Sequence, residues 1–141
     1  MHDIALVYLE EIEKEYLTEM VKAEKIGDYY RIASIPFFAK HLAIGDLISV
    51  DTEDGVHYFD DIIERSGNTT IRIIIKDKTN ARDLLTKVSD NGAIIHILTT
   101  SDILVALDIP DKLNYESIKV LLDLGQAEDI WEYEEACLGW K

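Results

Sequence analysis

Apolar and polar residues alternate in short runs through the first part of the chain, a pattern typical of half-buried β-strands. Such runs cover residues 5–11 and 29–36, the second ending at Pro36. Residues 11–26 fit either a short helix or a strand, and the strand is favoured in their second half. We therefore expect at least three strands before residue 37.

A hairpin is predicted further along the same half. Residues 47–67 contain two β-rich runs on either side of Asp54-Gly55, a pair that favours a tight turn between antiparallel strands. Residues 37–43, just before this hairpin, fit a compact apolar corner or one helical turn. Residues 1–68 are therefore predicted to form a β-meander or a small barrel.

The pattern changes after residue 68. Residues 69–77 read as a strand, and residues 79–92 have the periodicity of an amphipathic helix. Thr79 is the expected N-cap of this helix, and Gly92 lies just past its end.

Two more strands, a second helix and a last strand follow. The strands are expected at residues 93–100 and 101–110, and Asn114 can cap a helix over residues 115–130. Residues 131–138 then return to an extended pattern. The resulting order, β-α-β-β-α-β, is that of a ferredoxin-like unit with two helices on one face of an antiparallel sheet.

The fold class is therefore α+β. A chain of 141 residues with 48% hydrophobic residues has the size of one domain, and no Pro-, Ser- or Gly-rich linker separates its two parts. We predict a single domain, residues 1–141, in which a β-rich half (1–68) and a ferredoxin-like half (69–141) share one compact core or else dock closely.

Charge narrows the range of partners. Twenty-eight acidic and fourteen basic residues give a formal net charge of −14, which repels phosphate backbones and anionic membranes. No apolar run is long enough to span a membrane, and the N-terminus lacks the features of a secretory signal. A single cysteine, Cys137, agrees with a reducing compartment. We expect a cytoplasmic protein that binds neither nucleic acid nor membrane.

The acidic residues gather in two stretches without a Lys or Arg. The first acidic group comprises Asp51, Glu53, Asp54, Asp60, Asp61 and Glu64. The second acidic group comprises Asp123, Glu128, Asp129, Glu132, Glu134 and Glu135. The two groups are either solvated faces that keep the protein soluble or surfaces that dock a basic protein. If they dock a protein, every residue of both groups except Asp123 is a predicted contact.

Catalytic and metal-binding motifs are missing from the sequence. The seven glycines are isolated from one another, so no phosphate-binding loop can be written, and the four histidines lack the spacing of metal ligands. Cys137 follows several glutamates, which disfavour a reactive thiolate. We predict a protein that is not an enzyme and has no catalytic residue, no metal site and no cofactor.

Two smaller features have open interpretations. The polar residues 66–70 interrupt two β-rich runs and form either a plain turn or a binding loop. If a ligand pocket lies between the halves, its predicted residues are Ser66, Asn68, Thr70 and Arg72. Trp131, Tyr133 and Trp140 either close the core or anchor an interface.

Three motifs carry a resemblance to a known family. They are residues 34–39 (Ser-Ile-Pro-Phe-Phe-Ala), 43–48 (Ala-Ile-Gly-Asp-Leu-Ile) and 66–72 (Ser-Gly-Asn-Thr-Thr-Ile-Arg). The chain resembles the bacterial family known as domain of unknown function 4265, although Asn68 stands where members often carry His. The resemblance implies a bacterial protein and brings no activity with it.

Two functions fit these observations. The leading hypothesis is an immunity protein that neutralises a bacterial toxin, such as a basic nuclease, by direct binding. The alternative is a ligand-binding or regulatory module with a pocket between the two halves.

Overall fold

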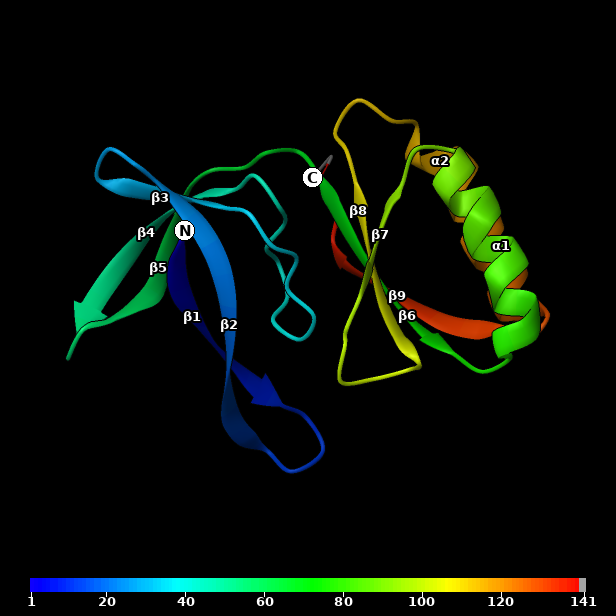
Figure 1. Ribbon diagram of the computed structural model, residues 1–141, viewed down its shortest axis with the longest axis horizontal. Coiled ribbons are helices and arrows are strands. Elements are labelled where there is room, and N and C mark those ends of the chain that lie inside the picture. Colours follow the sequence, from blue (N-terminus) through cyan, green and yellow to red (C-terminus); the bar gives the residue numbers. More distant parts are fainter. Residues whose placement is uncertain (140–141) are drawn as a thin grey trace.

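The computed structural model describes residues 1–139, which form a β-rich half and an α/β half side by side (Figure 1). Trp140 lies outside the described residues. The strands of the first half are β1 (His2–Glu10), β2 (Glu15–Ile26), β3 (Tyr29–Ile32), β4 (Leu47–Glu53) and β5 (Val56–Glu64). They form a closed barrel in the order β1-β2-β3-β4-β5, so of the two predicted arrangements the small barrel is the one observed.

The β4–β5 turn has the predicted hairpin chemistry. Asp54 and Gly55 both have positive φ, 51° and 80°, which matches the twist of two-residue hairpins. Residues 15–26 are strand throughout, so the helical alternative for this segment is wrong.

Strands β1 and β2 form a long hairpin that extends beyond the barrel (Figure 1). Strand β1 pairs with β2 from His2 to Glu10, but it pairs with β5 only at Ile4 and Ala5. The distal part of this hairpin, which we call the β1–β2 ribbon (residues 6–20), is therefore two-stranded.

The second half has the predicted element order. Its elements are β6 (Thr69–Ile75), α1 (Lys78–Asp90), β7 (Ile94–Ile97), β8 (Leu104–Ile109), α2 (Tyr115–Ala127) and β9 (Trp131–Cys137). The strands form one antiparallel sheet in the order β7-β8-β6-β9. Both helices lie on the same side of this sheet (Figure 1).

Capping residues define where the two helices begin. The side chain of Asn114 accepts a hydrogen bond from the backbone N–H of Glu116, as predicted. The N-cap of α1 is Asp77 and not Thr79, because the Asp77 carboxylate accepts the N–H of Asn80. Asp and Thr both cap helices, and here Asp77, which comes earlier in the chain, is the residue that caps the first turn.

The buried apolar residues form two clusters, so the predicted single core is wrong. One cluster lies inside the barrel and includes Ile4, Ile32 and Ile48. The other fills the space between the second sheet and its helices and includes Ile71 and Trp131. Each half therefore buries its own apolar side chains, and a polar joint connects the halves.

Candidate functional site

The joint is formed by the β3–β4 loop (residues 33–46), which contacts the face of the second sheet that carries no helix. Because side chains alternate along β6, Ile71 and Ile73 face the helices while Thr70 and Arg72 face this loop. Thr70 Oγ1 donates a hydrogen bond to the carbonyl of Leu42 (3.1 Å). No helical turn forms at residues 37–43, where the other alternative, an apolar corner, is observed.

Arg72 makes the most extensive contact across the joint. Its guanidinium donates to the carbonyl of Phe38 at 2.7 Å, to the carbonyl of Ala39, and to Glu134 Oε1 at 3.4 Å. The side chain is almost completely buried, which lowers its pKa despite the neighbouring Glu134. Glu19 in β2 holds the same loop from the barrel side, because its carboxylate accepts the backbone N–H groups of residues 37–39.

Ser66 and Asn68 complete the joint. Ser66 donates its N–H and its hydroxyl to the buried carboxylate of Asp46, at 2.9 and 3.1 Å. Asn68 Nδ2 donates to Asp108 Oδ1 at 3.1 Å, and its Oδ1 accepts the N–H of Asp111 at 3.0 Å. All four residues predicted for a pocket, Ser66, Asn68, Thr70 and Arg72, therefore hydrogen-bond to other parts of the chain.

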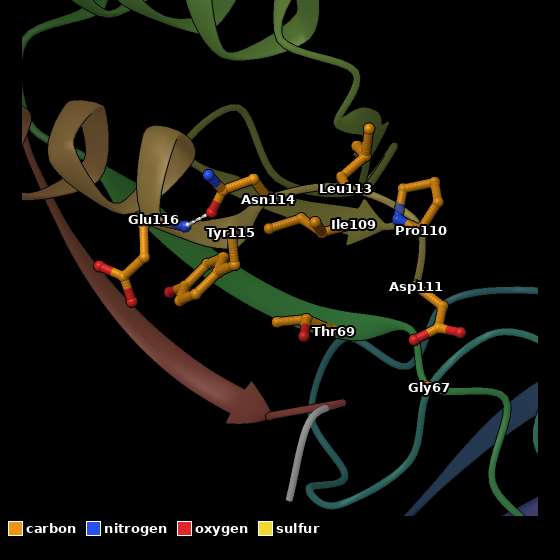
Figure 2. Close-up of a pocket in the computed structure, with 9 residues that line it drawn as sticks. All are labelled: Gly67, Thr69, Ile109, Pro110, Asp111, Leu113, Asn114, Tyr115 and Glu116. Carbon is orange, nitrogen blue, oxygen red and sulfur yellow. Dashed lines mark hydrogen bonds between the residues drawn. The ribbon is translucent and has the colours of Figure 1, made fainter.

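A cavity of about 280 Å³ lies next to this segment, at the start of α2 (Figure 2). Gly67 and Thr69 form one side of it, and Pro110, Asn114 and Tyr115 lie opposite. None of the four predicted pocket residues lines it. Its Asn114 side chain is engaged in capping α2, and the carboxylates of Asp111 and Glu116 also line the cavity.

A larger groove of about 450 Å³ runs between the β1–β2 ribbon and the second sheet. Tyr8 and Phe38 lie in its lining with stacked rings, 5.9 Å apart between centroids. Ile74 and Leu104 line the sheet side, and Arg72 is the one predicted pocket residue that borders it. The sequence predicted a pocket between the halves, and this groove lies there and includes Arg72. Its other lining residues were not predicted, because they come from segments that are far apart in the chain.

The first acidic group occupies the β4–β5 hairpin and the strand that leads away from it. All six side chains are exposed. None of them takes part in an ion pair within residues 1–139. The hairpin therefore presents concentrated negative charge that the rest of the described chain does not neutralise.

The second acidic group behaves differently, because the fold brings basic side chains to it. Glu134 pairs with Lys40 and Arg72 at 3.6 and 3.4 Å. The remaining contacts are Lys76 with Asp129 and Glu132, Lys119 with Glu135, and a hydrogen bond from Tyr133 to Asp123. Glu128 is exposed and makes no ion pair among the described residues. Four of the five predicted contact residues in this group thus serve internal ion pairs.

The structure also locates the aromatic and sulfur-containing candidates. Trp131 is fully buried and donates from Nε1 to the carbonyl of Leu122, so it belongs to the core. Tyr133 is half-buried on β9. Burial is the main cause that raises the pKa of the Cys137 thiol, and the charge of Asp46 is the next. From the sequence, the neighbouring glutamates were the expected cause.

Within residues 1–139, no three or more His, Cys, Asp and Glu side chains are grouped in a way that could hold a metal ion. No helix in the same range is both long and apolar enough to cross a membrane.

The family model described as "Domain of unknown function (DUF4265)" matches residues 19–133. A solved structure titled "Novel crystal structure of a hypothetical protein from Neisseria gonorrhoeae" is similar, with a TM-score of 0.87 and 29% sequence identity over 99% of this chain and 96% of that one. No curated protein matches.

Proposed function

The chain belongs to the DUF4265 family, and we propose that it is a non-enzymatic binding protein that docks a basic protein on its first acidic group. One observation carries this proposal: six exposed carboxylates gather on one hairpin, and no ion pair among the described residues engages them. Unpaired surface charge of one sign speeds association with a partner of opposite sign. The second acidic group contributes less, because internal ion pairs already use most of its carboxylates.

The narrower form of the proposal is an immunity protein, which neutralises a basic toxin in the cytoplasm by covering its substrate site. An acidic hairpin suits this role, since a nuclease must present a basic surface to its own anionic substrate. The same charge disfavours direct binding of nucleic acid or of an anionic membrane by this chain.

Co-expression tests the proposal. Reading frames adjacent to the gene are expressed in a bacterial host with and without this chain. We expect one of them to arrest growth and the chain to restore it. A variant with Asp54→Lys, Asp60→Lys and Asp61→Lys should fail to restore growth.

A matched variant provides the control. Asp83→Lys, Asp90→Lys and Glu116→Lys change the net charge by the same amount at exposed positions outside both acidic groups. This control should protect as well as the native chain. The proposal is wrong if no neighbouring frame is toxic, or if both triple variants protect equally.

The second candidate is a ligand-binding or regulatory module. The groove between the β1–β2 ribbon and the second sheet favours it, because a volume of about 450 Å³ lies in the range of typical ligand sites. We also infer that the C-terminal half is a ferredoxin-like unit, given its antiparallel strand order β7-β8-β6-β9 with two helices on one face.

A further inference from the structure

The β1–β2 ribbon has an unpaired edge beside the groove. Strand β1 continues to Glu10, but its pairing with β5 ends at Ala5. Among the described residues, no other strand pairs with residues 6–10 on that side. Their outward backbone N–H and C=O groups are therefore available to a further strand.

The groove runs along this edge. Tyr8, Leu9 and Glu10, the last three residues of β1, line it, as do Glu11 and Ile12 of the turn that follows. Consecutive residues of a strand point to opposite faces, so a cavity bordered by such a run faces the edge of the strand rather than one of its faces.

Apolar side chains lie exposed around the groove. Leu9, Ile12 and Ile74 are 39%, 87% and 48% exposed, and the stacked rings of Tyr8 and Phe38 lie among them. Natural proteins commonly protect such edges with lysine, proline or a bulge. Residues 6–10 contain neither lysine nor proline, and their pairing with β2 is regular.

Charge indicates the kind of strand that would fit. Four glutamates line the groove, Glu10, Glu11, Glu132 and Glu134, against two basic residues. Glu11 also pairs with Lys14 and Glu132 with Lys76, whereas Glu10 is in no ion pair among the described residues. The two basic residues in the lining, Lys40 and Arg72, are both paired with Glu134. The rim is therefore negative, and a second copy of this chain would bring like charge to it.

We propose that the groove binds an extended polypeptide segment of alternating apolar and basic residues, which adds as a strand to residues 6–10 of β1. Backbone hydrogen bonds would supply the affinity, and the apolar lining and glutamate rim would select the side chains. This proposal develops the second candidate function and concerns a different surface from the acidic hairpin.

The probe is a capped heptapeptide, Lys-Val-Lys-Ile-Lys-Val-Lys, titrated into the ¹⁵N-labelled chain. We expect chemical-shift changes at residues 6–12, Phe38 and Leu104, with slower amide hydrogen exchange within residues 6–10. The same peptide N-methylated at alternate amides, on the side that faces β1, should bind at least about tenfold more weakly, because it cannot donate to the strand edge.

A pair of variants locates the site. Leu9→Lys places a like charge against the peptide at the proposed edge and should weaken binding at least about fivefold. Val120→Lys makes the same change at an exposed position on α2 and should leave binding unchanged.

Four results would overturn the proposal: no binding, equal binding of the N-methylated peptide, equal effects of the two variants, or shift changes confined to the β4–β5 hairpin. The last result would leave the acidic docking surface supported. Concentration-dependent dimers with residues 6–10 protected in the absence of peptide would also contradict it, because a second copy would then occupy the edge.

Discussion

Arg72 links the two halves through a single guanidinium group. It satisfies the carbonyls of Phe38 and Ala39 and pairs with Glu134 while being only 6% exposed. Removing one partner of a buried polar network leaves the other groups unpaired. We predict that Arg72→Ala lowers the free energy of unfolding by about 2–4 kcal/mol, measured by urea denaturation.

Two further variants test whether the stability loss comes from the contacts of Arg72 in the joint or from the removal of a positive charge alone. Arg72→Lys should recover part of the loss, since an ammonium group can still reach one carbonyl. Arg82→Ala, at an exposed position on α1, should change stability by less than about 0.5 kcal/mol. Equal stability of Arg72→Ala and the native chain would show that the joint does not depend on this contact.

Asp108 gives the joint a pH dependence. Burial raises the pKa of its carboxyl, although the hydrogen bond from Asn68 opposes the shift. The pKa of this carboxyl is higher in the folded chain than in the unfolded chain, so its protonated form favours folding. This contribution to stability is fully present below the unfolded pKa, near 3.9, and is lost as pH rises through the folded pKa.

Asp108→Asn tests this pH dependence, because it keeps an acceptor for Asn68 and carries no charge. We expect this variant to be more stable than the native chain at neutral pH, with the difference shrinking as the pH falls toward about 4. Urea denaturation across this range measures it. If the stability difference between the variant and the native chain does not vary with pH, the charge of Asp108 is not the cause of that difference.

The acidic residues show what a sequence can and cannot reveal at this scale. Both groups look alike along the chain, because neither contains a base. In the fold, Lys40, Arg72, Lys76 and Lys119 reach the second group from other elements, whereas no ion pair within residues 1–139 involves the first group. The difference depends on tertiary contacts, so charge spacing along the chain could not predict it.

At the scale of elements, Gly125 sets how closely α2 approaches β9. A Cβ at this position would lie 2.8 Å from Cζ2 of the buried Trp131 and nearer still to other indole atoms. Overpacking a tight core contact costs about 1–3 kcal/mol. We predict a loss of this size for Gly125→Ala, measured by thermal or urea unfolding.

Gly55 provides the contrast for that prediction. A Cβ there would meet no atom within 4 Å, but the residue has a φ of 80°. Gly55→Ala should therefore cost about 1–2 kcal/mol, through the backbone alone.

The origin of the Gly125→Ala cost can be tested with a second substitution. If Trp131→Phe does not reduce the stability loss caused by Gly125→Ala, the contact with the indole is not its origin.

Most elements could be predicted because their periodicity is local. The hairpin at Asp54-Gly55, the cap at Asn114 and the β-α-β-β-α-β order all follow from neighbouring residues. The β3–β4 loop could not be predicted in the same way. Its conformation depends on Glu19 and Arg72, which are distant in sequence and bind it from opposite sides.

At the scale of the whole molecule, two apolar clusters meet at a polar joint. Composition predicted enough apolar surface for a core, but it could not show how that surface would be divided. The division leaves the β4–β5 hairpin and the β1–β2 ribbon on the barrel half and the helices on the other (Figure 1). The barrel half therefore carries the acidic hairpin and the strand edge beside the groove, and the second sheet forms the other wall of that groove.

The proposed role of the first acidic group is to dock a basic protein. Its most direct test is isothermal titration of the purified partner from the co-expression experiment, at low and at physiological salt. The variant with Asp54→Lys, Asp60→Lys and Asp61→Lys should bind at least about tenfold more weakly at low salt and depend less on salt than the native chain. The variant with Asp83→Lys, Asp90→Lys and Glu116→Lys should bind like the native chain. Equal affinities and equal salt dependence for the two variants would contradict the claim.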